Sequence, residues 1–305
     1  MSFRVNNSVK KKLMDAHLHL DCQNSLGECC FWDSRDHCLW WTDIERSCVW
    51  QMDSEKNATC FNLPGRAGFI LPRRDPGFVI GFPKLVALAN QKLTEFTKLC
   101  DVETDLPQTR INDATVDPFG GIVFGTFDET RDMKKRQPIA SVYRLAPDAT
   151  LRKLFGNVVI SNGLAFSPDG TTMYFADTPD GRIRRFRVGT DFEEFEEIEP
   201  LPDKEATPGL PDGATVDAEG NYWNARVWGG CLVRFDPSGN VTAQIDLPTK
   251  GPTCPAFGGS SLQQLFATTL RVHHSPEELT ATPEAGGIFV ADIDIPGLEQ
   301  RLCTL

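Results

Sequence analysis

The sequence predicts an all-β fold, a six-bladed β-propeller that spans residues 1–305 as one domain. A nine-residue pattern recurs every 50 residues, and its copies begin at Asn112, Asn162 and Asp212. Within each copy, a short apolar run, a turn rich in Asp, Pro and Gly, and a second apolar run predict strand, tight turn, strand. A fixed period of about 45 residues is typical of propeller blades with four strands each.

Weaker copies of the same pattern complete the ring of six. They lie at residues 28–43, 69–80 and 255–268. The first of them places Glu28 in the position that Asn162 holds in its own repeat. Turn spacing alone also allows a β-solenoid or a pair of sandwiches, so these folds remain alternatives.

Composition excludes several classes of partner. The net charge of −11 and the pI near 5.0 argue against nucleic acid, because a nucleic-acid surface needs a basic face to neutralise phosphates. No apolar run is long enough to cross a membrane, and the N-terminal residues lack the apolar core of a signal peptide. We therefore expect a cytoplasmic protein without membrane contact, a monomer or small homo-oligomer, whose ten cysteines are free thiols.

A ring of oxygen donors is the candidate functional site. Equivalent repeat positions converge on the axis of a propeller, so Glu28, Asn112, Asn162 and Asp212 should face one another across the central channel. Two desolvated carboxylates repel each other without a counter-charge, and a divalent cation would supply it. An all-oxygen set suits Ca²⁺, Mg²⁺ or Mn²⁺, and less selectively Zn²⁺ or Fe²⁺. The alternative is that these polar residues only line a wet channel.

Several motifs in this order resemble a known family. They are Leu26-Gly27-Glu28, Arg110-Ile111-Asn112-Asp113, Ser161-Asn162-Gly163-Leu164, Pro211-Asp212-Gly213 and Cys254-Pro255-Ala256-Phe257-Gly258. Their order and spacing are similar to the senescence-marker-protein / gluconolactonase family, also called regucalcin-like or luciferin-regenerating-enzyme-like. The resemblance covers nearly the whole chain, and it implies a six-bladed propeller with one divalent metal ion in the channel. One departure is Cys29-Cys30, where the family usually has Gly-Pro.

The resemblance also implies roles for individual residues. The metal would be held by Glu28, Asn162 and Asp212, with Asp212 also acting as the catalytic acid/base. Arg110 and Asn112 would bind substrate, and Glu129 lies where family members contact substrate hydroxyls.

The activity that the resemblance implies is hydrolysis of a sugar lactone, a small-molecule substrate, to the aldonic acid. Two other functions remain open: a non-enzymatic calcium-binding regulatory propeller, and a paraoxonase-like lactonase that acts on apolar substrates. The sequence does not identify the lactone. Arg226, Arg73 and Arg74 are either solvated or packing arginines, or ligands for an anionic substituent of the substrate.

Overall fold

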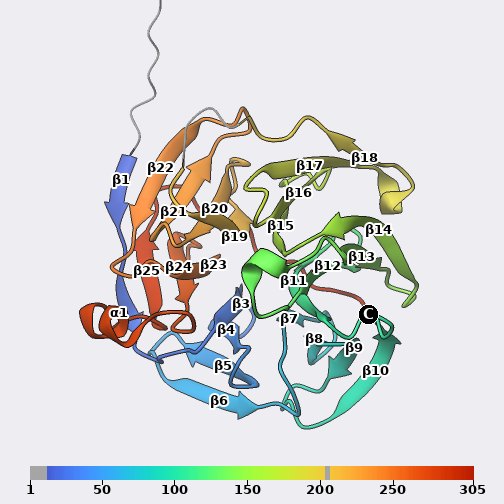
Figure 1. Cartoon of the computed structure of the whole chain (residues 1–305), viewed down its shortest axis with the longest axis horizontal. Helices are drawn as coiled ribbons and strands as arrows, with labels where there is room; N and C mark the ends of the chain where they lie inside the picture. The colour runs from blue at the N-terminus through green and yellow to red at the C-terminus, as the bar shows by residue number, and fades with distance from the viewer. Residues whose placement is uncertain (1–11, 203–206) are drawn as a thin grey trace, which may run out of the picture.

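Six β-sheets surround a central channel, as the sequence predicts, in a computed structural model that describes residues 12–202 and 207–305 (Figure 1). Each blade contributes its first strand to the channel wall. Blade 1 contains β3 (Gly27–Asp33), β4 (Cys38–Asp43), β5 (Cys48–Asp53) and β6 (Ala58–Asn62). Blade 2 contains β7 (Phe69–Pro72), β8 (Phe78–Phe82), β9 (Leu85–Ala89) and β10 (Phe96–Asp101). Blade 3 contains β11 (Thr109–Val116), β12 (Ile122–Asp128), β13 (Ala140–Leu145) and β14 (Leu151–Val158).

The second half of the ring repeats this arrangement. Blade 4 contains β15 (Ser161–Phe166), β16 (Thr172–Asp177), β17 (Ile183–Val188) and β18 (Phe195–Ile198). Blade 5 contains β19 (Leu210–Val216), β20 (Tyr222–Val227), β21 (Cys231–Phe235) and β22 (Val241–Asp246). Blade 6 contains β23 (Pro252–Gly258), β24 (Gln264–Thr269) and β25 (Ile288–Asp292) from the C-terminal part of the chain.

The N-terminal strands join the last two blades and close the ring. β2 (His17–Leu20) pairs with β25 as the outermost strand of blade 6, so His17 and His19 lie on an edge strand. β1 (Lys12–Asp15) runs parallel to β22 and makes blade 5 five-stranded, one strand more than the repeat predicted. Chain segments that are far apart in sequence therefore share one sheet.

Helical structure is confined to connections between strands. The short helices are η1 (Met133–Lys135), η2 (Thr190–Phe192) and α1 (Pro276–Ala281). Ser275 caps α1: its hydroxyl accepts a hydrogen bond from the Glu278 amide, and its own amide donates one to the Glu278 carboxylate. None of the helices in the described residues has the length and apolar character needed to span a bilayer.

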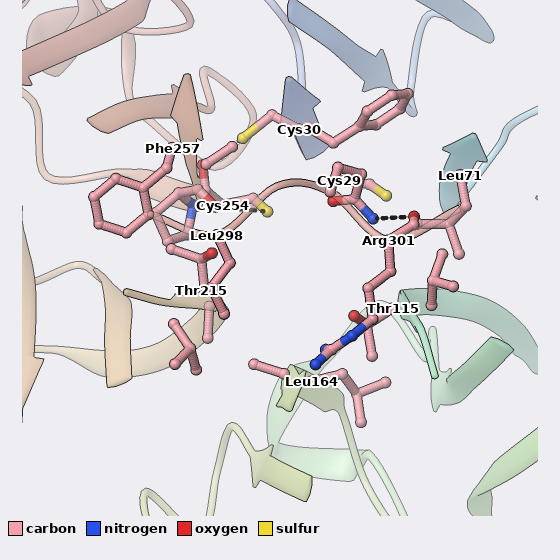
Figure 2. A pocket seen from close by; sticks show the side chains of 18 of the residues that line it. Cys29, Cys30, Leu71, Thr115, Leu164, Thr215, Cys254, Phe257, Leu298 and Arg301 are labelled. Atoms are coloured by element: carbon pink, nitrogen blue, oxygen red, sulfur yellow. Dashed lines mark hydrogen bonds between the residues drawn. The ribbon is translucent and has the colours of Figure 1, made fainter. Parts of the chain in front are cut away.

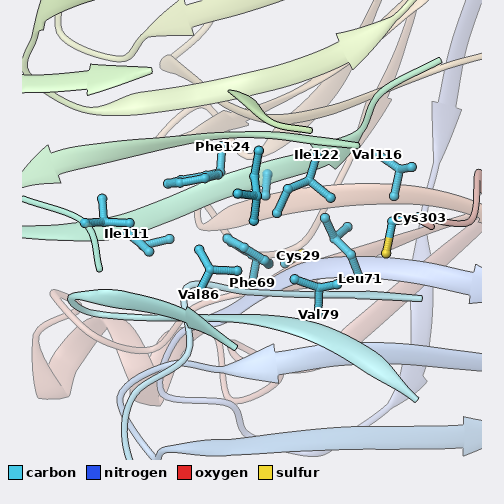
Figure 3. Packing of buried hydrophobic residues seen from close by; sticks show 13 residues of the cluster. Cys29, Phe69, Leu71, Val79, Val86, Ile111, Val116, Ile122, Phe124 and Cys303 are labelled. Carbon is cyan, nitrogen blue, oxygen red and sulfur yellow. The ribbon is translucent and has the colours of Figure 1, made fainter. Parts of the chain in front are cut away.

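The hydrophobic core is divided among the interfaces between neighbouring blades. In the cluster between blades 2 and 3, Phe69 and Val79 face Ile122 and Phe124, and all four are fully buried (Figure 3). The rings of Phe69 and Phe124 lie 6.0 Å apart. Comparable clusters fill the other five interfaces, and full burial of one such side chain contributes about 1.5–3 kcal/mol. The core therefore holds the blades together without using the polar residues of the channel.

The cysteines of blade 1 act as small apolar residues, as predicted. Cys29, Cys30, Cys38 and Cys48 are all buried, and all ten cysteines of the chain are free thiols. Cys30 donates a hydrogen bond from Sγ to the Cys254 carbonyl at 3.0 Å, which ties blade 1 to blade 6.

Five of the inner strands carry a β-bulge at the same depth in the channel. In β3, β11, β15, β19 and β23, two residues oppose one residue of the neighbouring strand, whereas β7 pairs regularly. A bulge bends the strand and re-aims the side chains beside it. In β15 the residue after Asn162 is Gly163 with φ 66°, and in β3 the residue after Glu28 is Cys29 with φ 46°. Cys29 thus occupies a left-handed conformation that ordinarily favours glycine.

We predict that Cys29→Gly is more stable than Cys29→Ala by about 1 kcal/mol. Both variants lose the thiol, but alanine keeps a Cβ in the left-handed region and glycine does not. Cys231, which has no positive φ, is the matched control: there alanine should be the more stable replacement. Chemical denaturation of the four variants gives the comparison, and the same order at both positions would contradict strain at Cys29.

Candidate functional site

The predicted ligands lie on three inner strands, and the entries of two of these strands are fixed in the same way. Asp43, at the end of β4, accepts hydrogen bonds from the backbone amides of Ser25 and Leu26, just before Glu28. Asp177, at the end of β16, accepts them from Val159 and Ile160, just before Asn162. Each carboxylate holds the chain where it enters the inner strand, so the position of the following side chain is set by backbone contacts.

A chain of hydrogen bonds joins the polar side chains of blades 3, 4 and 5. Arg110 donates from Nη1 to Oδ1 of Asn112 at 2.9 Å, and Asn112 donates from Nδ2 to Oδ1 of Asn162 at 3.1 Å. Asn162 in turn donates from Nδ2 to Thr178 at 2.9 Å, and the Thr178 hydroxyl donates to the Pro211 carbonyl beside Asp212. Because Nδ2 of Asn162 donates to Thr178, Oδ1 of Asn162 faces Asn112.

Three carboxylates gather at the channel. Asp212 is buried, whereas Glu28 and Asp113 keep some exposure to the channel. Burial raises the pKa of Glu28 well above its usual range, and the charges of Asp212 and Asp113 raise it further. Burial, with a contribution from Asp113, likewise raises the pKa of Asp212, and burial raises the pKa of Asp113 to about 7. The site therefore has too little positive charge to balance its three acidic side chains when they are ionised.

The donor set fits a hard divalent cation. Nowhere in residues 12–202 and 207–305 do three or more His, Cys, Asp or Glu side chains gather in the arrangement of a metal site. A cation would therefore depend on the two carboxylates of Glu28 and Asp212 together with the amide oxygen of Asn162. Such oxygen ligands suit Ca²⁺, Mg²⁺ or Mn²⁺, and a positive charge would relieve the repulsion among the acids.

Arg110 lies beside Asn112 in this site and is almost fully buried. Its guanidinium lies 4.3 Å from the centre of the Phe127 ring, and Nη1 also donates to the Ile111 carbonyl. Nε has no hydrogen-bond partner, although Oε2 of Glu129 is 3.6 Å away. Burial lowers the pKa of Arg110 to about 10 against the opposing effect of Glu129, so the group stays charged at neutral pH.

Glu129 lies beside Arg110, close to the mouth of the channel. Both of its carboxylate oxygens accept hydrogen bonds from Arg66, at 3.1 and 2.9 Å. The predicted substrate residues Arg110, Asn112 and Glu129 are thus neighbours on blade 3, and Arg66 is an additional member of the group that the sequence did not indicate.

The other three arginines, for which the sequence left both packing and anion binding open, make contacts with the protein backbone. Arg226 is buried and donates to the carbonyls of Pro208 and Gly209 and to Asn224. Arg73 donates to the Leu305 carbonyl, and the Arg74 amide donates to the Cys303 carbonyl. The Arg73 side chain and the Arg74 backbone therefore contact the C-terminal segment, which favours the packing alternative for these two residues.

A cavity of about 100 Å³ lies in the channel, with Asp113 among its lining residues. Its walls are the later residues of the inner strands, including Cys29, Asp113 and Leu164, and its floor is residues 298–301. Figure 2 shows Arg301 extending across the cavity toward Leu164. Arg301 donates to the carbonyls of Ser167 and Pro168, so the C-terminal segment is fastened across this end of the channel. The opposite end, beside Arg110, is the side from which a substrate would approach.

Besides Arg66, two more members of the site were missed in the sequence. Asp113 occupies a repeat position at which the next two copies have Gly163 and Gly213, and this replacement of glycine by an acid was a usable signal. Thr178 orients Asn162, but it directly follows Asp177 in a turn and no pattern marks it. Only the three-dimensional pairing of β15 with β16 places it there.

We predict that Asp113→Asn stabilises the metal-free protein at pH 8. Because the pKa of Asp113 is raised to about 7 in the folded state, the folded protein binds this proton more tightly than the unfolded chain does. Stability from this group is present below about pH 4 and is lost as the pH rises to about 7. The melting temperature of the variant should exceed that of the wild type at pH 8, and the difference should shrink at pH 5. Exposed Asp36→Asn is the control, and an equal effect of Asp113→Asn at both pH values would contradict the assignment.

Comparison with known proteins identifies the family. Residues 26–271 match the SMP-30/Gluconolactonase/LRE-like region. The chain is 32% identical over 278 residues to 6-deoxy-6-sulfogluconolactonase of Pseudomonas putida, covering 91% of this chain and 94% of that protein. It is 35% identical over 289 residues to L-arabinolactonase of Azospirillum brasilense, covering 93% of each.

A solved structure agrees with these sequence relatives. The calcium-binding protein regucalcin of Agrobacterium tumefaciens superimposes with a TM-score of 0.88 at 29% identity, over 96% of this chain and 99% of the other. The family indicated by the sequence motifs is thereby confirmed. The protein is a member of the SMP-30/gluconolactonase/LRE-like family.

Proposed function

We propose that the protein hydrolyses a sugar lactone to the corresponding aldonic acid in a metal-dependent reaction. The observation that carries the proposal is the set of oxygen donors from Glu28, Asn162 and Asp212 beside Arg110, whose buried Nε lacks a hydrogen-bond partner. Relatives that share about a third of the sequence over nearly the full length are named lactonases, which supports the enzyme class.

Asp212 is suited to move the proton in this reaction. A divalent cation bound at the site would polarise the lactone carbonyl and offset the charge that develops on its oxygen. Asp212 takes a proton from the attacking water and returns it to the ring oxygen as the carbon–oxygen bond of the lactone breaks.

Arg110 and Asn112 are suited to hold the sugar. The fixed planar guanidinium of Arg110 offers Nε toward the channel mouth, and the Phe127 ring below it prevents rotation. Asn112 is held by Arg110 on one side and by Ser161 and Asn162 on the other, so its amide cannot turn away from the site. Together they would orient hydroxyl groups of the lactone relative to Asp212.

The competing function is calcium binding without catalysis. It is favoured by the gathering of acids at the channel and by the calcium-binding description of regucalcin from Agrobacterium tumefaciens. A buried arginine with a free donor at the same site favours the enzyme, because binding a cation gives no role to a second positive charge. The apolar-lactone alternative is disfavoured because Arg66, Arg110 and Glu129 border the channel mouth.

Screening aldonolactones with a pH indicator, with and without a chelator, tests the proposal. We expect hydrolysis of a sugar γ-lactone that is lost on chelation and restored by one of the divalent ions. The circular dichroism spectrum should stay the same, because the apolar clusters between the blades do not include the ligands. Hydrolysis that survives exhaustive chelation would rule out the metal role, and faster hydrolysis of γ-butyrolactone than of the sugar lactone would favour apolar substrates.

Asp212→Asn should lower kcat by at least about a hundredfold while much of the metal content remains, because an amide can still ligate but cannot carry a proton. Arg110→Ala is the contrasting variant: it should raise KM and leave the metal content unchanged. Steady-state kinetics with metal analysis on both variants separates the two roles. Full activity of Asp212→Asn would overturn the assignment of Asp212 as acid/base.

A further inference from the structure

The connection between β12 and β13, residues 129–139, forms a lid over the channel mouth. Its helical turn, η1, is the bright green segment in front of the channel in Figure 1. Asp128 holds the base of the lid by accepting hydrogen bonds from the Thr130 amide, the Thr130 hydroxyl and the Gln137 amide. These hydrogen bonds to Asp128 hold the two ends of the lid together.

Arg136 lies on the inner side of this lid, near Arg110. Its guanidinium is 5.1 Å from the centre of the Phe127 ring, whose other neighbour is the guanidinium of Arg110 at 4.3 Å. Nε of Arg136 donates to the Thr130 carbonyl at 3.0 Å, which fixes the direction of the side chain. Arg136 is only partly exposed, whereas the other lid cations Arg131, Lys134 and Lys135 are exposed.

The charge of Arg136 also affects His273 on blade 6, which lies across the ring from blade 3. The pKa of His273, in the connection between β24 and α1 of blade 6, is lowered by burial and by the charge of Arg136. Blade 6 is opposite blade 3 in a ring of six. Arg136 is therefore close enough to blade 6 for its charge to affect His273.

The donors of Arg136 are largely unused. Within the described residues, neither Nη group donates a hydrogen bond, and no carboxylate oxygen lies within ion-pair distance of Arg136. Two acids are near enough to affect its charge, but the oxygens of Glu129 are taken by Arg66, and those of Asp128 by Thr130 and Gln137. A partly desolvated guanidinium whose two Nη groups make no hydrogen bond to the described residues is suited to bind an anion.

We propose that Arg136 binds a sulfonate or phosphate group carried by the sugar lactone at the end opposite to its carbonyl. This inference rests on the proposed function, because it takes the carbonyl to lie at Asp212, deep in the channel, with the rest of the sugar directed toward the lid. The tetrahedral oxyanion would accept hydrogen bonds from both Nη groups, and Arg110, which contacts the same Phe127 ring, would hold the hydroxyls between them. Arg136 is thus a specificity residue and takes no part in the proton transfers.

The test compares three hexonolactones: the neutral sugar lactone and the same lactone with a sulfonate or a phosphate at C6. Wild-type kcat/KM should be higher for at least one anionic lactone than for the neutral one. Arg136→Ala should lower kcat/KM for that lactone by about tenfold to a hundredfold, mainly through KM, and change the neutral reaction by less than about threefold. Arg136→Lys should recover part of the loss, and the anionic lactone that loses more identifies the group recognised.

Lys135→Ala is the matched control, since it removes an exposed cation of the same lid that pairs only with Asp132. It should leave the preference for the anionic lactone in place. Equal losses on the neutral and anionic lactones in Arg136→Ala would show a purely structural role, and a wild-type preference for the neutral lactone would also overturn the inference while the lactonase assignment stands. If no lactone of the three were hydrolysed, the proposed function itself would fail.

Discussion

Closure of the ring is the constraint on which the rest of the structure depends. β2, from the start of the described chain, pairs with β25 near its end, and this pairing completes blade 6. Apolar clusters then fill all six interfaces between blades, so each sheet is held on both faces. Once the ring is closed, the first strands must converge on one axis, and residues that lie about 50 positions apart in sequence become neighbours.

The convergence of the inner strands brings acidic side chains close together, and their repulsion costs electrostatic free energy. Glu28, Asp113 and Asp212 meet where burial raises the pKa of each, and their negative charges oppose one another. Isolated charges in such surroundings cost several kcal/mol each unless they are paired. The apolar clusters between blades supply stability from elsewhere, which allows the channel to keep an arrangement that favours cation binding over stability of the metal-free protein.

The repeat explains how much could be predicted from the sequence. Periodicity determined the blades and the inner-strand positions of Glu28, Asn112, Asn162 and Asp212, because equivalent positions in a ring face the same axis. Features that depend on how the strands pack together in three dimensions could not be predicted from the sequence. Thr178 orients Asn162 only because β16 folds back on β15, and Arg73 meets the C-terminal segment only after the ring has closed. The extra strand β1 lies outside the repeat altogether.

Residues that decide substrate choice are the least predictable, since they lie on connections that the repeat does not constrain. Arg66, Glu129 and Arg136 come from two different connections, and the positions of their charges follow from side-chain contacts over Phe127 and Arg110. The ring fixes where a carbonyl could be attacked, whereas the lid decides which group at the far end of the molecule is accepted. A chain with net charge −11 repels anions at long range, so recognition of an anionic sugar requires a guanidinium at contact distance. The lid places Arg136 where that contact can form.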